Sequence, residues 1–202
     1  MDHGSRSGGN AVKSVRLVVM SLVLVGAAIM VGCAGPQRVP KPPVGDESVM
    51  TVYLTGYSFW DNTPPGSAAI ARPVLHKRAG GVGSYKDPIT IAVGHRIEDG
   101  VQSLDFEPGT RFYLPELKKY AIVEDVCGDG PTPQLGPCHI GHKGHPWLDI
   151  YVGGRSITPE QAEECMRSIT GVQKAVMHPR SGYAVEKGEI AQSTCAEDSG
   201  NS

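Results

Sequence analysis

The sequence predicts a mainly all-β fold, and three observations lead to that prediction. Gly and Pro are frequent, with 26 and 16 residues, which favours turns between short strands. The apolar runs are short, and only one segment carries a clear helix signal. Many short strands with a single short helix are typical of a small β-barrel. With 202 residues, the chain can form one ordinary domain with a hydrophobic core and tails.

Strands are expected where short apolar or alternating runs are bounded by turn residues. The first two such runs cover residues 50–57 and 89–93. A loop over 58–67 and a Gly-rich turn over 79–87 separate them. The turn lacks the spacing of a phosphate-binding loop, which makes a nucleotide site a poor interpretation. The polar segment 96–105 is predicted to be a loop.

Later strands are predicted by the same pattern. They cover residues 111–114, 117–125, 147–152, 172–177 and 182–185.

One helix is expected over residues 158–168. Thr158 is suited to the N-cap, Pro159 to the first turn, and Gln161 completes a capping box.

Residues 1–32 are predicted to be a lipoprotein signal peptide. A basic flank precedes the apolar run 17–32, which is shorter than the ~20 residues of a typical membrane-spanning helix. The run ends in Met-Val-Gly-Cys33, which resembles the bacterial lipobox. That resemblance implies lipidation of Cys33 and an exported domain anchored to a bacterial membrane. An ordinary signal peptide or anchor helix with an incidental cysteine is the alternative.

The remaining chain divides into three parts. Residues 33–49 are rich in Pro and are expected to form an extended tether. Residues 50–195 are expected to form the barrel domain, in the periplasm or the cell-wall space. The polar tail 196–202 is predicted to be disordered. The formal net charge of −2 gives no indication of nucleic-acid binding.

Four cysteines follow Cys33, and an even number in an exported domain implies two disulfides with three possible pairings. We favour Cys127 with Cys138, which closes the intervening loop, and Cys165 with Cys195, which pins the C-terminal tail. A zinc site is the less favoured use, because no Cys-x-x-Cys pair is present.

Two acids interrupt short apolar strands. Asp125 follows the run 120–124, and Asp149 lies within the run 147–152. Acids are depleted in strands because an ionised carboxylate loses water there. Either each carboxylate accepts backbone hydrogen bonds in a structural role, or both acids share a polar groove. The sequence leaves both interpretations open.

The order of these segments resembles the double-psi β-barrel superfamily. Its members include rare lipoprotein A, the three-aspartate domains, membrane-bound lytic transglycosylase A, expansins and family-45 endoglucanases. The motifs that carry the resemblance are Thr55-Gly56-Tyr57, Ile91-Ala92-Val93-Gly94, Pro108-Gly109-Thr110, Val123-Glu124-Asp125-Val126-Cys127-Gly128 and Leu148-Asp149-Ile150-Tyr151. The resemblance implies a six-stranded double-psi β-barrel with one or two short helices. It covers residues 50–154, with a last strand near 172–177.

The resemblance also implies roles for the acids. Asp125 and Asp149 match two acids of the three-aspartate domains, whereas Gly94 stands where those domains carry an acid. The acid in the Asp149 context is catalytic in the lytic transglycosylase, so Asp149 is the expected acid. Asp125 would orient it or bind sugar, and Asp61 is a possible second carboxylate.

Four further residues are candidates for substrate binding. Tyr57, Trp60 and Trp147 could stack on sugar faces, and His145, four residues before Asp149, could tune that acid. A metal site at His139, His142 and His145 requires a loop that wraps around the ion, and we expect neither a metal nor a cofactor.

We therefore expect a cell-envelope lipoprotein whose barrel binds a polysaccharide, with peptidoglycan as the first candidate, in an expansin-like manner without turnover. Gly94 and the lack of a clear second catalytic carboxylate favour binding. The context of Asp149 favours the alternative, a lytic transglycosylase or glycoside hydrolase. A protease-inhibitor-like module is a second alternative. The expected partners are the cell-wall glycan, the membrane through Cys33, and an envelope protein.

Overall fold

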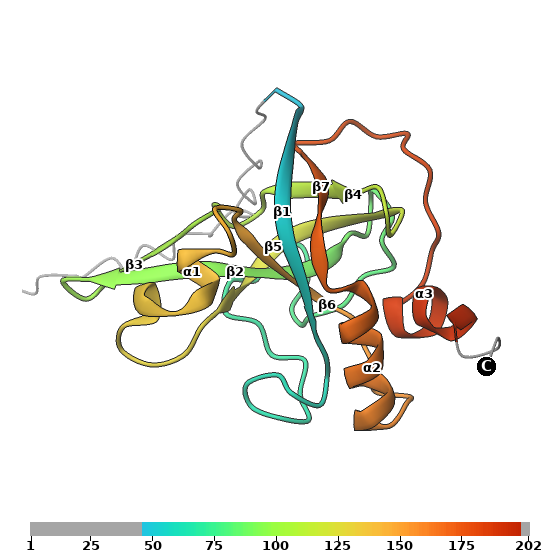
Figure 1. The fold of residues 1–202 in the computed structure, drawn as a ribbon, viewed down its shortest axis with the longest axis horizontal. Coiled ribbons are helices and arrows are strands. Elements are labelled where there is room, and N and C mark those ends of the chain that lie inside the picture. Colours follow the sequence, from blue (N-terminus) through green and yellow to red (C-terminus); the bar gives the residue numbers. More distant parts are fainter. Residues whose placement is uncertain (1–45, 199–202) are drawn as a thin grey trace, which may run out of the picture. The chain divides into compact units, whose positions relative to one another are not determined.

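The computed structural model describes residues 46–198, and the fold is mainly β, as the sequence predicted (Figure 1). The strands are β1 (Ser48–Tyr57), β2 (Ile89–Glu98), β3 (Val101–Leu104), β4 (Arg111–Leu114), β5 (Lys119–Cys127), β6 (Trp147–Tyr151) and β7 (Gly171–Met177). The helices are the 3-10 helix η1 (Pro133–Leu135), α1 (Pro137–Ile140), α2 (Pro159–Ile169) and α3 (Ile190–Asp198).

The strands form one mixed sheet of seven, in the order β3-β2-β5-β4-β7-β1-β6. An additional pairing joins β2 to β6. Two pairs are parallel, β1 with β6 and β2 with β5. Because β2 pairs with both β5 and β6, every strand except β3 has a partner on each side. Of these seven strands, β3 pairs with β2 alone, as an edge strand.

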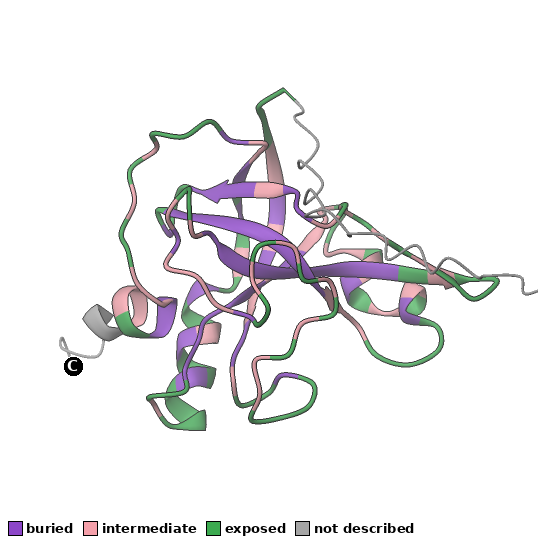
Figure 2. Ribbon diagram, turned by 180° about the vertical axis from the view of Figure 1, so that it is seen from behind, coloured by how far each residue is buried: buried purple, intermediate pink, exposed green. Residues whose placement is uncertain are grey.

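The central strands are buried along most of their length (Figure 2). The side chains of Leu54, Ile91, Val93, Leu148 and Ile150 are fully buried in one cluster. Burial on both faces requires nearly continuous apolar runs, which explains why β2 and β5 are apolar rather than alternating at their starts.

Helix α2 confirms the predicted start signal. Thr158 is the N-cap, and it exchanges hydrogen bonds with Gln161 in a capping box. The helix buries Ala162, Cys165 and Ile169, and it packs so close to β1 that a Cβ on Gly56 would meet Ile169 at 3.2 Å.

Both favoured disulfides are present. Cys127 pairs with Cys138 across a Cα separation of 5.8 Å, and Cys165 pairs with Cys195 across 5.4 Å. The second joins α2 to α3, which places the C-terminal helix beside α2 (Figure 1).

Three local expectations are corrected. Residues 96–105 are not a loop, because β2 and β3 form a hairpin there, and polar side chains are tolerated at a sheet edge that faces water. Residues 182–185 form no strand. The amide of Tyr183 donates to the Tyr120 hydroxyl and its ring stacks on Tyr113, so side chains hold this segment. Finally, α3 takes in residues 196–198, which we had assigned to a disordered tail.

The segment predicted to be a signal peptide, Cys33 and most of the predicted tether lie outside the described residues, as do 199–202. Within the described part, none of the helices has the length and apolar character that crossing a membrane requires.

Candidate functional site

A cleft of about 360 Å³ opens beside β1, β2, β5 and β6. Its walls come from these strands, from the long loop between β1 and β2, and from the loop after β5. The lining residues are Tyr57, Asp61, Asn62, Thr63, Ala69, Ile70, Ala71, Ala92, Asp125, Val126, Cys127, Gly128, Asp129 and Asp149.

The two acids predicted from the sequence lie in one row of the sheet. Ala92 of β2 pairs with Asp125 on β5 and with Asp149 on β6. Residues that pair directly across neighbouring strands project to the same face. Two strand spacings separate the acids, which places their Cα atoms roughly 10 Å apart. Both side chains line the cleft, and Asp125 also accepts backbone hydrogen bonds.

A β-bulge in β5 brings Asp125 into this row. The pairing with β2 moves from Ile91–Val123 to Ala92–Asp125, so Glu124 is the extra residue. Without the bulge, Glu124 would pair with Ala92. The two neighbouring acids therefore have separate positions, with Asp125 in the cleft and Glu124 fully buried.

Asp149 is held by a chain of hydrogen bonds. The indole Nε1–H of Trp147 donates to Oγ1 of Thr55 over 2.7 Å, and the Thr55 hydroxyl donates to Oδ1 of Asp149 over 2.6 Å. The indole occupies one lone pair of Thr55 Oγ1, which leaves the single hydroxyl hydrogen free to donate to the Asp149 carboxylate. No described residue donates to Oδ2 of Asp149. This oxygen is therefore available to a ligand.

Burial raises the pKa of Asp149 to about 7, and the charges of Asp61 and Asp125 add to the rise. The Thr55 hydrogen bond opposes it. Since a pKa near 7 divides the group between its two forms at neutral pH, Asp149 can both donate and accept a proton there.

Both carboxylate oxygens of Asp125 accept hydrogen bonds, in contrast to those of Asp149. Its Oδ1 accepts the backbone N–H groups of Ala71 and Val126, each at 2.9 Å, and its Oδ2 accepts the Tyr57 hydroxyl at 3.1 Å. Burial raises the pKa of Asp125, and these three hydrogen bonds limit the rise. The side chain is positioned to shape the cleft rather than to move.

Asp61 lies on the exposed rim of the cleft. Its Oδ1 accepts both the backbone N–H and the hydroxyl of Ser58, at 2.7 and 2.6 Å. This arrangement forms a turn at the start of the loop after β1 and fixes the carboxylate at the rim.

Tyr57 lines the cleft, whereas the candidates Trp60, His145 and Trp147 lie outside its lining. The Trp60 indole N–H donates to the carbonyls of Gly154 and Ile157, at 2.9 and 3.1 Å, so this ring closes the loop 154–157. Trp147 reaches the site through Thr55 alone. His145 forms an isolated bridge with His142, whose ring stacks on Tyr53. Among the described residues, no cluster of three His, Cys, Asp or Glu side chains could hold a metal ion.

Gly94 cannot be replaced by an acid in this fold. A Cβ at this position would lie 2.3 Å from Oδ2 of Asp105 and 2.4 Å from the carbonyl oxygen of Cys138. The neighbouring disulfide and α1 therefore occupy the space that a third aspartate would need. His95 instead contacts the Gly128 carbonyl at 2.8 Å, which ties down the loop after β5 at the edge of the cleft.

Several site residues were not identified from the sequence. Thr55 was noted only as part of a motif, and Asn62, Asp129 and residues 69–71 belong to loops with no distinctive pattern. The available signal was the pair of consecutive acids Glu124 and Asp125 within an apolar strand.

The family model described as the DDB_G0273701 N-terminal domain matches residues 49–196. An uncharacterized protein of Dictyostelium discoideum is 41% identical over 143 residues, which is 69% of this chain and 56% of the relative. The chain thus spans just over half the length of that relative. No solved structure matches. On these grounds, the chain belongs to the family of the DDB_G0273701 N-terminal domain.

Proposed function

We propose that the cleft binds a polysaccharide strand, and that protonated Asp149 donates a hydrogen bond to a sugar oxygen there. The domain then acts as an expansin-like binding module without turnover. The observation that carries this proposal is the free Oδ2 of Asp149, on a carboxyl whose pKa is about 7, in an open cleft. A carboxyl that is protonated near neutral pH is a hydrogen-bond donor suited to sugar hydroxyls and ring substituents.

The proposal includes the double-psi β-barrel. The ring of pairings β2-β5-β4-β7-β1-β6, closed by β6 with β2, supports a six-stranded barrel. The two parallel pairs, β1 with β6 and β2 with β5, support the double-psi arrangement. In this interpretation β3 is an addition to the barrel strand β2.

Binding without turnover is favoured by the state of Asp125, which is one of the two acids whose charges act on Asp149 and which accepts hydrogen bonds at both of its oxygens. Hydrolysis with water requires two carboxyl groups, one as acid and one as base or nucleophile. Asp125 accepts three hydrogen bonds, and Asp61 accepts two. Asp125 would have to give up these bonds to activate water, whereas Asp61 holds both of its bonds at Oδ1 and lies on the exposed rim.

The charge of the lining indicates which glycans fit. Asp61, Asp125, Asp129 and Asp149 line the cleft, and no Lys or Arg is among the lining residues. A strand with carboxylate or sulfate groups would meet like charge, so neutral strands are favoured. We keep peptidoglycan as the first candidate, because its carboxylates lie on the stem peptides and not on the sugar backbone, and we add cellulose as a neutral strand.

Cleavage is the second candidate, and the pKa of Asp149 favours it. One acid near pKa 7 can protonate a glycosidic oxygen and then accept a proton back, which suffices when a hydroxyl of the sugar itself attacks. Asp149 would then be the single catalytic residue of a lytic transglycosylase.

We further propose that the protein is exported and anchored through lipid on Cys33. Two disulfides in the described domain support an oxidising compartment. Mass spectrometry of the mature N-terminus tests the anchor, with Cys33→Ser as the control.

Sedimentation with insoluble peptidoglycan and with cellulose tests the function. We expect retention on at least one glycan at pH 6, without release of reducing ends or anhydro-sugars. Release that Asp149→Asn abolishes would favour the second candidate. Retention on neither glycan would contradict both.

A further inference from the structure

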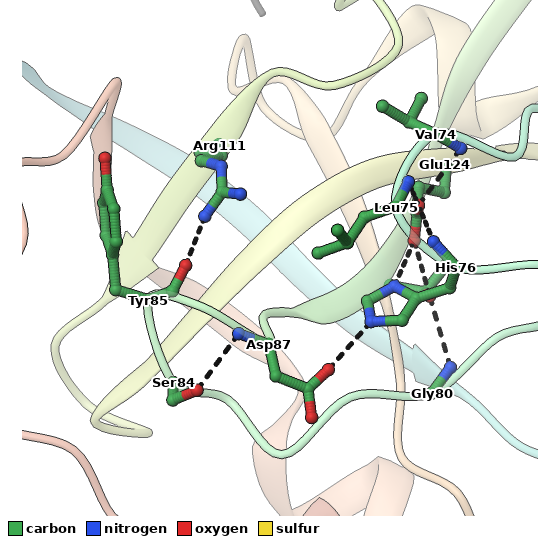
Figure 3. Close-up of polar contacts among 10 residues, drawn as sticks. Val74, Leu75, His76, Gly80, Ser84, Tyr85, Asp87, Arg111 and Glu124 are labelled. Atoms are coloured by element: carbon green, nitrogen blue, oxygen red, sulfur yellow. Dashed lines mark hydrogen bonds and ion pairs between the residues drawn. The ribbon is translucent and has the colours of Figure 1, made fainter. Parts of the chain in front are cut away.

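The segment that forms one wall of the cleft is anchored to Glu124. Residues 69–71 line the cleft, and the chain then passes over β5. The Arg72 amide donates to the Glu124 carbonyl at 2.9 Å. Directly after it, three consecutive backbone N–H groups donate to Oε1 of the Glu124 side chain, from Val74, Leu75 and His76 at 3.2, 2.6 and 2.7 Å. Residues 74–76, which form no helix or strand, are held by this one carboxylate (Figure 3).

His76 bridges Glu124 to a second carboxylate. Its Nδ1 lies 2.6 Å from Oε2 of Glu124, and its Nε2 lies 2.8 Å from Oδ1 of Asp87. In Figure 3 the imidazole ring lies between the two acids. A neutral imidazole has one N–H, whereas the imidazolium has two. Only the charged ring can donate to both carboxylates at once.

We propose that His76, as an imidazolium, is a positioning residue of the glycan cleft that holds the wall segment 69–76 against β5. This inference rests on the proposed function for its consequence in binding, but its structural part stands on the contacts alone. Loss of the charge would set a ring lone pair against one carboxylate. The bridge from Asp87 across the segment to Glu124 would then open.

The surroundings of His76 favour the charged form. Glu124 is fully buried and the His76 side chain is 18% exposed, whereas Asp87 is 46% exposed. The acids that act on the ring are Glu124 from β5 and Asp87 from its own loop. Burial lowers the pKa of His76, but the hydrogen bonds and charges of the two acids outweigh it and leave the pKa raised. The bridge is therefore complete below the ordinary His pKa and opens as the pH rises through the raised value.

The anchor connects directly to the cleft. The Ala71 amide donates to Asp125, and the next residue donates to the Glu124 carbonyl. The two acids of the bulge thus hold neighbouring points of one segment. If the His76 end loosens, the segment keeps its hydrogen bonds at Ala71 and Arg72 but loses those at residues 74–76.

Amide hydrogen exchange on the full-length chain tests the proposal without requiring a glycan. In the wild type we expect the protection factors of the Ala71 and Leu75 amides, corrected for intrinsic exchange, to fall at least tenfold between pH 6 and pH 8.5. Asp149→Asn, which removes the carboxyl whose pKa is about 7, is expected to show the same fall.

Two variants complete the test. His76→Gln is expected to show low protection at both pH values. His139→Gln, the matched control, removes a different His–carboxylate pair, between His139 and Asp105 at 2.5 Å, and is expected to behave as the wild type. Protection in the wild type that does not change with pH, or equal protection in His76→Gln, would overturn the proposal. If His76→Gln does not fold, the wild-type pH series decides.

Glycan retention is measured in parallel. If no protein is retained on any glycan, the proposed function fails while the exchange result for His76 still stands. If the wild type is retained and His76→Gln is retained severalfold less at pH 6, both inferences are supported.

Discussion

Thr55 donates a hydrogen bond of 2.6 Å to Asp149 from the neighbouring parallel strand, and the two residues pair in register. Thr55 Oγ1 also accepts the Trp147 indole N–H, and its own hydrogen remains available for Asp149. The bond occupies Oδ1 and leaves Oδ2 as the place for the carboxyl proton. A ligand in the cleft thus meets the protonated edge of the group.

The first prediction concerns this hydrogen bond. Thr55→Val keeps the side-chain shape and removes the hydroxyl donor. In the wild type, the hydrogen bond from this hydroxyl lowers the pKa of Asp149. We therefore expect the Asp149 pKa to rise above about 7, measured by NMR titration of the carboxyl carbon. Thr51→Val on the same strand, whose hydroxyl meets Lys174 at 2.7 Å, is the control. An unchanged or lower midpoint in Thr55→Val would contradict this account.

The second prediction concerns stability and pH. The Asp149 pKa is raised from 3.8 to about 7 in the fold, so the folded state binds more protons than the unfolded state between these values. The free energy of unfolding must then decrease as the pH rises through that range. Asp149→Asn avoids the cost of the buried charge, and we expect it to stabilise the protein at pH 8 by roughly 2–4 kcal/mol. The gain should largely vanish at pH 4, as urea unfolding at both values can show. An equal effect at both would rule out the raised pKa.

The third prediction concerns Gly94. Its missing side chain makes room for Asp105 and the Cys138 carbonyl, so Gly94→Ala is expected to lower the free energy of unfolding by roughly 1–3 kcal/mol or more through overpacking. Gly171→Ala, where no atom lies within 4 Å of the new Cβ, is the matched control. Urea denaturation compares the two, and equal effects would contradict the close packing at Gly94.

The fourth prediction separates the two disulfides. Cys165 and Cys195 are 30 residues apart, and loss of a crosslink of this length is expected to cost about 3–4 kcal/mol in the chain-entropy account. Calorimetry of the Cys165→Ala, Cys195→Ala double variant measures this loss. Because neither cysteine lines the cleft, glycan retention below the melting transition should stay at the wild-type level. The Cys127→Ala, Cys138→Ala double variant releases the loop that carries Gly128 and Asp129, which line the cleft. We expect this variant to lose glycan retention in addition to stability.

Much of the fold could be predicted from local patterns. The apolar run 89–93 and the capping box at Thr158 are short-range signals, and both became elements close to the expected bounds. The disulfide pairing followed from loop closure between neighbouring cysteines in sequence order. The hairpin over 96–105 could not be predicted, because its strands are stabilised by pairing at an edge and not by an apolar face of their own.

Local patterns also predicted the two acids of the site, but they did not predict the contacts that hold its wall. Asp125 and Asp149 stand out because a carboxylate in an apolar strand needs an explanation, and both line the cleft. The contacts that hold the cleft wall join residues far apart in sequence, such as His76 with Glu124 across 48 positions. No local pattern marks such a pair. The bulge that separates Glu124 from Asp125 is likewise a property of the pairing between strands.

Retention on insoluble glycan at pH 6, compared among the wild type, Asp149→Asn and Asp149→Ala, tests the central claim most directly. An asparagine keeps an acceptor toward Thr55 and a permanent N–H donor toward the cleft, whereas alanine keeps neither. We predict that Asp149→Asn is retained like the wild type and falls less steeply as the pH rises past 7. Asp149→Ala should bind at least tenfold more weakly. Wild-type retention of Asp149→Ala on the same glycan would show that this acid does not meet the ligand.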